Sequence, residues 1–198
     1  MSTWAQYSLA LVAAVLFIPA FAKCQEASAP NQNWDIGIWS AIATGEEHTN
    51  SFTESQILTA GLFVGRIIKH EVGTGLWRGN FQYGFSVAPL LQLRPQHLYG
   101  IALEPAIFRW NSAHSLGRAF PYIELAGGGV HTSANLPTGD TSSFNFTAKG
   151  GGGIYLPTTS TQALDLGLRW AHISNANLGR QNAEFNGIEL RVGYHWFK

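Results

Sequence analysis

The sequence is poor in charge, in cysteine and in long apolar runs. Charged residues make up 12% of its 198 residues, well below the roughly 25% usual in soluble domains, and the formal net charge is zero. This balance provides no basic field, so we expect no nucleic-acid partner. Cys24 is the single cysteine, which excludes an intrachain disulfide.

Signatures of several enzyme classes are also missing. The chain has no G-x-S-x-G sequence, which argues against the usual soluble lipase pattern. Its seven histidines are scattered, with neither an HExxH motif nor a cluster of His and Cys residues. We therefore expect no metal site and no cofactor.

Aromatic residues and glycine are abundant instead. Aromatic residues reach 13%, and there are 22 glycines. Few charges, many aromatics and many glycines, without a long apolar helix, are typical of a transmembrane β-barrel. A soluble β-sandwich would share the glycine content, but it would not need so low a fraction of charge.

The N-terminus has the features of a secretory signal peptide, which we predict over residues 1–22. Its apolar run, Leu9–Phe21, is short for a membrane helix and ends in Ala20-Phe21-Ala22, which is similar to a cleavage site. No Lys or Arg lies in this stretch, so an N-terminal anchor is the alternative. A polar segment follows at 23–33, and the barrel domain is predicted over 34–198.

Eight segments with strand-like composition follow, each near or above the roughly 9–11 residues that a tilted strand needs to cross a bilayer. The segments are Trp34–Ala43, Gln56–Lys69, Leu76–Leu93, Leu98–Trp110, Phe120–Ser133, Phe144–Leu156, Ala163–Ser174 and Phe185–Phe197. Turn-rich stretches separate them. An even number of strands can close antiparallel, with both termini on one side. We therefore predict an all-β fold, an eight-stranded antiparallel barrel of the outer-membrane type.

The interior of so small a barrel is expected to be filled by side chains, without a pore. Several charged residues fall on or near the strands and are expected to pair inside the barrel. These residues are Glu104, Glu124, Lys149, Asp165, Arg169 and Arg191. The alternation of the last segment also turns His195 inward.

The strongest functional signal lies in residues 163–177. On one face of this strand, four apolar residues alternate with the others: Leu164, Leu166, Leu168 and Trp170. The next two residues of the same face are His172 and Ser174. Polar groups on a lipid-facing surface are costly, so this pair is a functional candidate.

The pair has the chemistry of an esterase. Residues i and i+2 of a strand share a face, so an imidazole that leans along the strand reaches the hydroxyl. His172 is then a general base and Ser174 a nucleophile. A strand rises by about 3.3 Å per residue along its axis, and a tilted strand climbs less across the membrane. If the N-terminus is periplasmic, His172 lies roughly 23 Å above Ala163 along the membrane normal, at the outer-leaflet edge. As a bare pattern, however, His-x-Ser also occurs by chance.

The sequence around this pair resembles a known family. The run His172-Ile-Ser-Asn-Ala-Asn-Leu178, followed by Asn182 and the C-terminal strand, resembles the outer-membrane lipid A 3-O-deacylases of the PagL family. The resemblance implies an eight-stranded barrel that removes the ester-linked 3-O-acyl chain of lipid A in lipopolysaccharide, without a metal. It implies that Ser174 is the nucleophile and His172 the base. Asn175 and Asn182 match motif asparagines, with expected roles in an oxyanion hole or in ordering the loop.

The acid of the implied Ser-His-Glu triad has three candidates. An alignment without gaps places the family's glutamate on Asn186, which would orient His172 without a charge. An alignment through Gly-Ile-Glu selects Glu189, although its alternation turns it inward. Glu184 has outward parity and lies in the loop. We rank Glu189 first, then Glu184, with Asn186 as a neutral alternative.

Two other functions stay open at this stage. A small structural or adhesive barrel can carry the motif without activity, and a related esterase can act on another outer-membrane lipid. The sequence leaves the acyl-chain preference, the regulation and the oligomeric state undecided. The expected partners are lipid A and the surrounding outer-membrane lipids.

Overall fold

The chain forms a closed barrel of eight antiparallel strands, in which each strand pairs with the next and β8 closes on β1. The structure is a computed structural model and describes residues 32–45 and 55–198. The strands are β1 (Trp34–Gly45), β2 (Gln56–Val72), β3 (Gly79–Arg94), β4 (Leu98–Ser112), β5 (Phe120–Leu136), β6 (Ser142–Thr159), β7 (Gln162–Ser174) and β8 (Phe185–Phe197). The predicted signal peptide and most of the polar segment lie outside the described residues.

All eight predicted segments are strands, and most extend a few residues further than predicted. The third begins later, at Gly79 rather than Leu76, because Gly75–Trp77 forms a single 3-10 turn. Gly73 and Gly75 in this connection have φ angles of 73° and 56°, a conformation that glycine adopts without strain. In the described part of the chain, no helix is long and apolar enough to cross a membrane.

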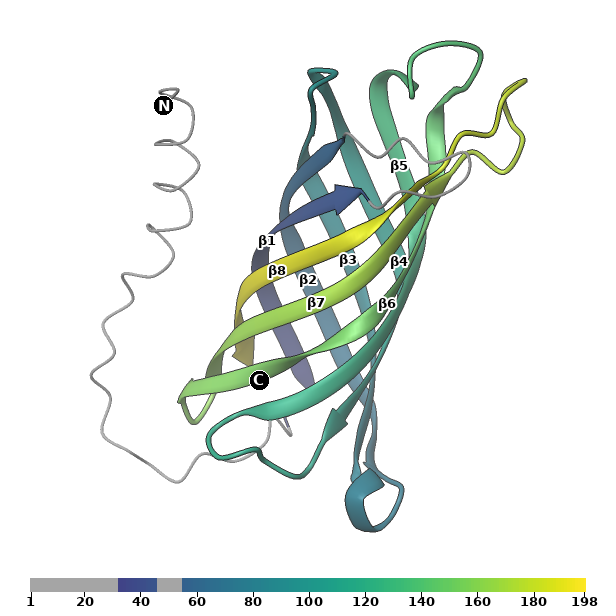
Figure 1. The fold of residues 1–198 in the computed structure, drawn as a ribbon. Coiled ribbons are helices and arrows are strands. Elements are labelled where there is room, and N and C mark those ends of the chain that lie inside the picture. Colours follow the sequence, from purple (N-terminus) through teal and green to yellow (C-terminus); the bar gives the residue numbers. More distant parts are fainter. Residues whose placement is uncertain (1–31, 46–54) are drawn as a thin grey trace.

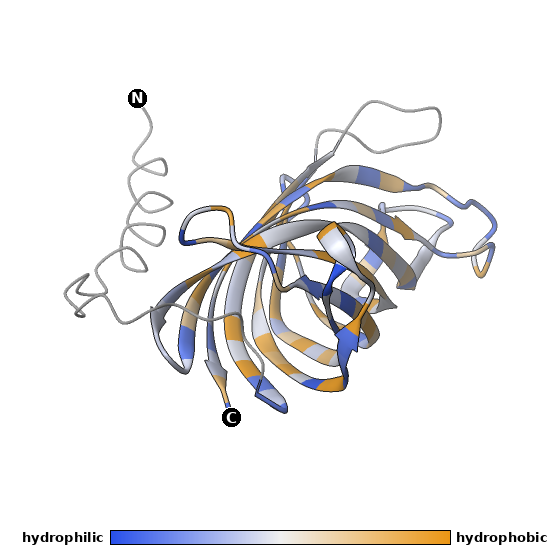
Figure 2. Ribbon diagram, turned by 90° about the horizontal axis from the view of Figure 1, so that it is seen from below, coloured by the Kyte–Doolittle hydropathy of each residue, from blue (hydrophilic) through white to orange (hydrophobic). Residues whose placement is uncertain are grey.

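The two faces of the wall differ in polarity. Along each strand, buried residues that point into the barrel alternate with exposed residues that point outward, as the pleat requires. The exposed residues are largely apolar, as in β1, where Ile36, Ile38 and Ile42 all point outward. Hydrophobic and hydrophilic residues accordingly alternate along the strands in Figure 2. This is the surface that a bilayer requires of a barrel.

The interior is filled by a layer of paired charges, as predicted. Its acidic members are Asp35, Glu104, Glu124, Asp165 and Glu189, and its basic members are Arg109, Lys149, Arg169, Arg191 and His195. Arg169, for example, contacts Glu124 at 2.8 Å and also pairs with Glu189. Each charge is neutralised by a neighbour, which is the condition for burying it. Apolar clusters that include Leu93 and Phe185, and Tyr155 and Phe197, complete the filling.

The two ends of the barrel carry different connections. The turns after β2, β4 and β6 lie at the end that also holds the start of β1 and the end of β8, which we call the terminus end (Figure 1). The connections after β1, β3, β5 and β7 lie at the opposite end, the loop end. Among them is the β7–β8 loop, residues 175–184, which contains Asn175, Asn182 and Glu184. The end of β7 therefore brings Ser174 to the loop end of the wall.

Candidate active site

The candidate nucleophile and base project from the outside of the barrel. In β7, Ala171 and Ile173 are buried inside, with 2% and 6% of their surface exposed, whereas His172 and Ser174 are partly exposed on the outer wall. The alternation that places Leu168 and Trp170 outward continues through both residues. The outward orientation expected from the sequence is therefore present.

Three side chains form a hydrogen-bonded series on this wall. His172 Nε2 lies 3.0 Å from Ser174 Oγ, and His172 Nδ1 lies 2.8 Å from Asn186 Oδ1. An amide oxygen only accepts hydrogen bonds, so Nδ1 carries the ring proton and donates a hydrogen bond to Asn186 Oδ1. Nε2 is then left as the acceptor for the Ser174 hydroxyl. This tautomer is the one that a general base needs.

The strand register explains why Asn186 meets His172. Asn186 is the direct partner of His172 across the antiparallel pair of β7 and β8. Cross-strand partners have their Cβ atoms about 4.5–5.5 Å apart on the same face, within reach of a side-chain hydrogen bond. Within β7, the Trp170 ring stacks on the imidazole, with ring centroids 5.7 Å apart and an angle of 15° between the ring planes. The ring is thus held by contacts from both strands.

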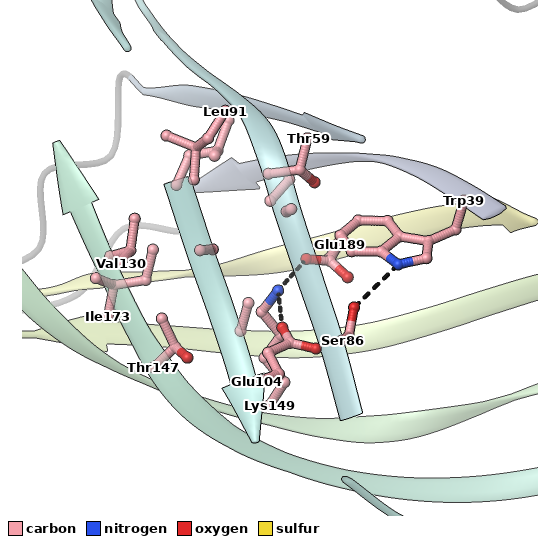
Figure 3. A pocket seen from close by; sticks show the side chains of 15 residues that line it. Trp39, Thr59, Ser86, Leu91, Glu104, Val130, Thr147, Lys149, Ile173 and Glu189 are labelled. Atoms are coloured by element: carbon pink, nitrogen blue, oxygen red, sulfur yellow. Dashed lines mark hydrogen bonds and ion pairs between the residues drawn. The ribbon is translucent and has the colours of Figure 1, made fainter. Parts of the chain in front are cut away.

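Glu189, the first-ranked candidate for the acid, lies inside the barrel and does not contact His172. Its carboxylate accepts a hydrogen bond from Lys149 Nζ at 2.8 Å (Figure 3). It accepts another from Arg169 Nε at 2.7 Å. The physical reason is its parity, because residues that flank Ile188 must point inward when Ile188 points to lipid. Buried with two cations, Glu189 belongs to the interior charge layer.

Glu184 is also not the partner of His172. It lies partly exposed in the β7–β8 loop, and no hydrogen bond or ion pair joins it to the imidazole. Of the three candidates, only Asn186 contacts the ring.

Asn175 and Asn182 hold the β7–β8 loop together. Asn175 is completely buried, and its Nδ2 donates to the carbonyl oxygen of Gln181 at 2.8 Å while its Oδ1 accepts from the amide of Asn177 at 2.9 Å. The backbone amide of Asn175 donates to Asn182 Oδ1 at 2.9 Å. These contacts close the loop directly after Ser174, the candidate nucleophile.

The turn after Ser174 has an uncommon backbone. Ala176 and Asn177 have φ angles of 50° and 65°, in the left-handed region. Asparagine tolerates this conformation, but for alanine it is rare and costs free energy. The loop is also tied to its neighbour, since the amide of Gln181 donates to the carbonyl oxygen of Asp140 at 2.9 Å. Local contacts therefore hold this turn in a defined shape beside the candidate nucleophile.

Within the described ranges, no group of three or more His, Cys, Asp or Glu side chains is arranged to hold a metal ion.

A family model described as lipid A 3-O-deacylase (PagL) matches residues 59–195. The match covers more than half of the chain and includes β7, the β7–β8 loop and most of β8. The chain belongs to the PagL family. No curated protein sequence matches it.

Solved structures agree with the fold. The crystal structure of the outer membrane enzyme PagL is similar with a TM-score of 0.52 and 18% identity, over 79% of this chain and 97% of that one. The crystal structure of Neisserial surface protein A is similar with a TM-score of 0.58 and 15% identity, over 83% of this chain and 97% of that one. The outer membrane protein OprG from Pseudomonas aeruginosa is similar with a TM-score of 0.52 and 8% identity, over 88% of this chain and 98% of that one. These likenesses show the barrel, and together with the PagL family they indicate an outer-membrane protein.

The site includes a part of the wall that the sequence analysis did not assign. Three outward residues of β6 next to β7 are small: Ala148 pairs with His172, Gly150 with Trp170 and Gly152 with Leu168. Further towards the loop end, the exposed Phe146 pairs with Ser174. The glycines permit close backbone approach, since a Cβ on Gly152 would lie 2.5 Å from the carbonyl oxygen of Tyr122. The run Gly150–Gly153 was the available signal in the sequence. A strip of wall without bulky side chains therefore flanks the PagL-family motif.

Proposed function

We propose that this chain is a serine esterase of the outer membrane that removes the ester-linked 3-O-acyl chain of lipid A in lipopolysaccharide. The observation that carries the proposal is the series Ser174–His172–Asn186 on the lipid-facing wall, with contacts of 3.0 and 2.8 Å. Membership of a family of lipid A 3-O-deacylases supports the substrate. A lipid reaches this wall sideways from its leaflet, so the filled interior is no obstacle.

In the first step, Ser174 Oγ attacks the carbonyl carbon of the ester while His172 Nε2 takes the hydroxyl proton. When the tetrahedral intermediate collapses, His172 returns this proton to the 3-oxygen of the sugar, which leaves as an alcohol. The acyl chain is then bound to Ser174. In the second step, water attacks the acyl-serine with His172 again as base, which releases the carboxylic acid and restores the hydroxyl.

Asn186 is a positioning residue in this scheme. By accepting the Nδ1 proton it holds His172 in the tautomer whose Nε2 is free to accept. A carboxylate at this position would also stabilise the imidazolium that forms when Ser174 loses its proton. A neutral amide does this less well. The proposed enzyme is therefore slower than one with an acid at the same position.

The β7–β8 loop supplies the oxyanion stabilisation in this proposal. The negative charge on the ester oxygen develops beside Ser174, so its hydrogen-bond donors belong to the turn 174–177. Asn175 and Asn182 keep that turn in shape through the contacts with Gln181 and Asn177. We assign both asparagines to loop ordering, because their bonds are used within the loop.

The small residues of β6 support an acyl chain as the ligand. Ala148 and Gly150 lie directly beside His172 and Trp170 on the outer face, and Leu125 flanks Gly150 from β5. A hydrocarbon chain that lies against this strip contacts apolar wall on both sides. This strip begins beside His172, the proposed base, and the exposed Phe146 adds apolar surface beside Ser174.

The decisive test is to incubate purified protein with lipopolysaccharide and to weigh the lipid A by mass spectrometry. The wild type is expected to remove one hydroxyacyl chain, and Ser174→Ala none. Ser133→Ala is the matched control, because Ser133 is also an exposed serine two residues after a histidine, but it accepts a bond from the Tyr99 amide at 3.2 Å.

Three results would contradict the proposal. An unchanged lipid A with a folded wild type would favour a structural barrel. Release of acyl chains from a phospholipid but not from lipid A would favour another esterase. Equal activity of Ser174→Ala would remove Ser174 from the chemistry.

A further inference from the structure

The outer wall near the terminus end contains an arginine that the proposed chemistry does not use. The outward residues along this part of β2 are Leu62, Val64, Arg66 and Ile68, all of them exposed. Arg66 thus interrupts an apolar row on the surface that faces lipid. Such a charge is costly in the hydrocarbon and is tolerated at the interface, where headgroups solvate it.

The neighbours of Arg66 mark the level of that interface. Its register partners are Trp34 on β1 and Tyr83 on β3, and the guanidinium carbon lies 5.4 Å from the centre of the Trp34 ring. Trp34 is the first residue of β1, so this position lies at the edge of the barrel wall. Tryptophan and tyrosine gather at the headgroup level of membrane proteins. Arg66 therefore lies where lipid phosphates are.

The terminus end as a whole carries an excess of basic side chains. Its exposed cations are Arg66, Lys69, Arg78, Arg118 and Lys198. Among the residues that the structure describes, the exposed acidic side chain at this end is Glu71, which lies 3.8 Å from Arg78. In the same ranges, no carboxylate pairs with Arg66 or Lys69. At the loop end, by contrast, the connections that contain Arg180 and its neighbouring loop also contain two acidic residues, Asp140 and Glu184.

We propose that Arg66 and Lys69, together with Trp34, form a binding site for an anionic phospholipid in the leaflet at the terminus end. The guanidinium matches a phosphate with two parallel hydrogen bonds, and the ammonium of Lys69, three residues further along β2 and also exposed, adds positive charge at the same end of the barrel. The indole packs against the first part of the acyl chains and the glycerol. A zwitterionic lipid offers the same phosphate but adds a cation of its own, so the site prefers a net negative headgroup.

The test measures which lipids surround the protein. The full barrel is inserted into phosphatidylcholine vesicles that contain a trace of spin-labelled phosphatidylglycerol or spin-labelled phosphatidylcholine. The immobilised fraction of each label gives their relative association constant. One cation near an anionic headgroup corresponds to about a fivefold preference, so the wild type is expected to favour phosphatidylglycerol by about that factor or more.

Three variants separate the charge from the fold. Arg66→Gln/Lys69→Gln is expected to reduce the preference to near one, while Arg66→Lys keeps most of it. Arg180→Gln, at the loop end, leaves it unchanged. A wild type without preference, a double variant with the full preference, or an equal loss in Arg180→Gln would each overturn the proposal. Esterase activity does not enter this measurement, so the result tests the lipid site independently of the proposed function.

Discussion

The Nδ1 atom of His172 and the side-chain oxygen of Asn186 lie 2.8 Å apart on the lipid-facing wall, across a direct register pair of β7 and β8. A neutral amide therefore holds the imidazole at the position where the family motif, aligned without gaps, has a glutamate. Asn186 points to the same face as His172, so a carboxylate at this position would face the imidazole. Substitution of Asn186 by an acidic residue therefore measures how much a negative charge beside His172 adds to the rate.

Asn186→Glu is expected to raise kcat by roughly fivefold with little change in KM. A hydrogen bond to a charged partner is worth about 1 kcal/mol more than a neutral one, and about 1.4 kcal/mol corresponds to a factor of ten in rate. Initial rates of acyl release at several substrate concentrations measure both constants. Glu184→Gln, which removes an acid from the adjoining β7–β8 loop, is the control and leaves both unchanged. A kcat that stays equal or falls in Asn186→Glu would show that His172 does not charge in the rate-limiting step.

Asn186→Leu is expected to lower kcat by roughly ten- to a hundredfold, because the ring loses its acceptor and the wrong tautomer becomes populated. The loss of a partner for a part-buried donor costs about 1–3 kcal/mol. Nitrogen-15 NMR of the imidazole reports the tautomer directly, and a merely structural role would not alter it. Asn186→Asp, which keeps the acceptor, should retain activity. Equal loss in both variants would contradict the positioning role.

Glu189→Gln should change stability and not catalysis. It removes one carboxylate from between Arg169 and Lys149, and breaking a buried ion pair costs about 3–5 kcal/mol. The midpoint of urea unfolding in detergent is therefore expected to fall, while kcat per folded molecule stays the same. Glu71→Gln, which breaks an exposed pair of 3.8 Å, should cost at most about 1 kcal/mol. A selective loss of kcat in Glu189→Gln would return Glu189 to the site.

Asn182→Ala should loosen the loop that follows the nucleophile. It removes the acceptor for the Asn175 amide, a contact of 2.9 Å, and costs about 1 kcal/mol locally. Faster hydrogen exchange at residues 175–184 and a several-fold lower kcat are expected. Gln181→Ala is the matched control, because the loop uses only the backbone of Gln181. Unchanged exchange in Asn182→Ala would show that the loop is held by other contacts.

Ala148→Trp should obstruct the strip of small residues beside His172. The indole projects from the outer face of β6 into the place proposed for the acyl chain, so KM is expected to rise several-fold while folding is preserved. Ile38→Trp, an outward substitution on β1, is the control and should have no effect on KM. Equal KM values for Ala148→Trp and the wild type would place the acyl chain elsewhere on the wall.

Period-two alternation in the sequence was sufficient for most of the fold. It located all eight strands, placed His172 and Ser174 on the outer face, and turned Glu124, Arg169 and His195 inward. The reason is that the membrane makes the two faces of each strand opposite in polarity, so the pattern is read from local residues alone. The same alternation also turned Glu189 inward. Giving more weight to the motif than to this parity ranked first a carboxylate that contacts Lys149 and Arg169 rather than His172.

The pair that we propose as base and nucleophile, His172 and Ser174, was therefore already recognisable in the order of residues along one strand. The partner of His172 was not, because it depends on how two strands slide past each other as the barrel closes. A shift of one residue between β7 and β8 would turn Asn186 away from the imidazole, and only the closed register brings the two together. The contacts that shape the β7–β8 loop likewise come from folding, since they join backbone and side-chain atoms that no periodic pattern relates.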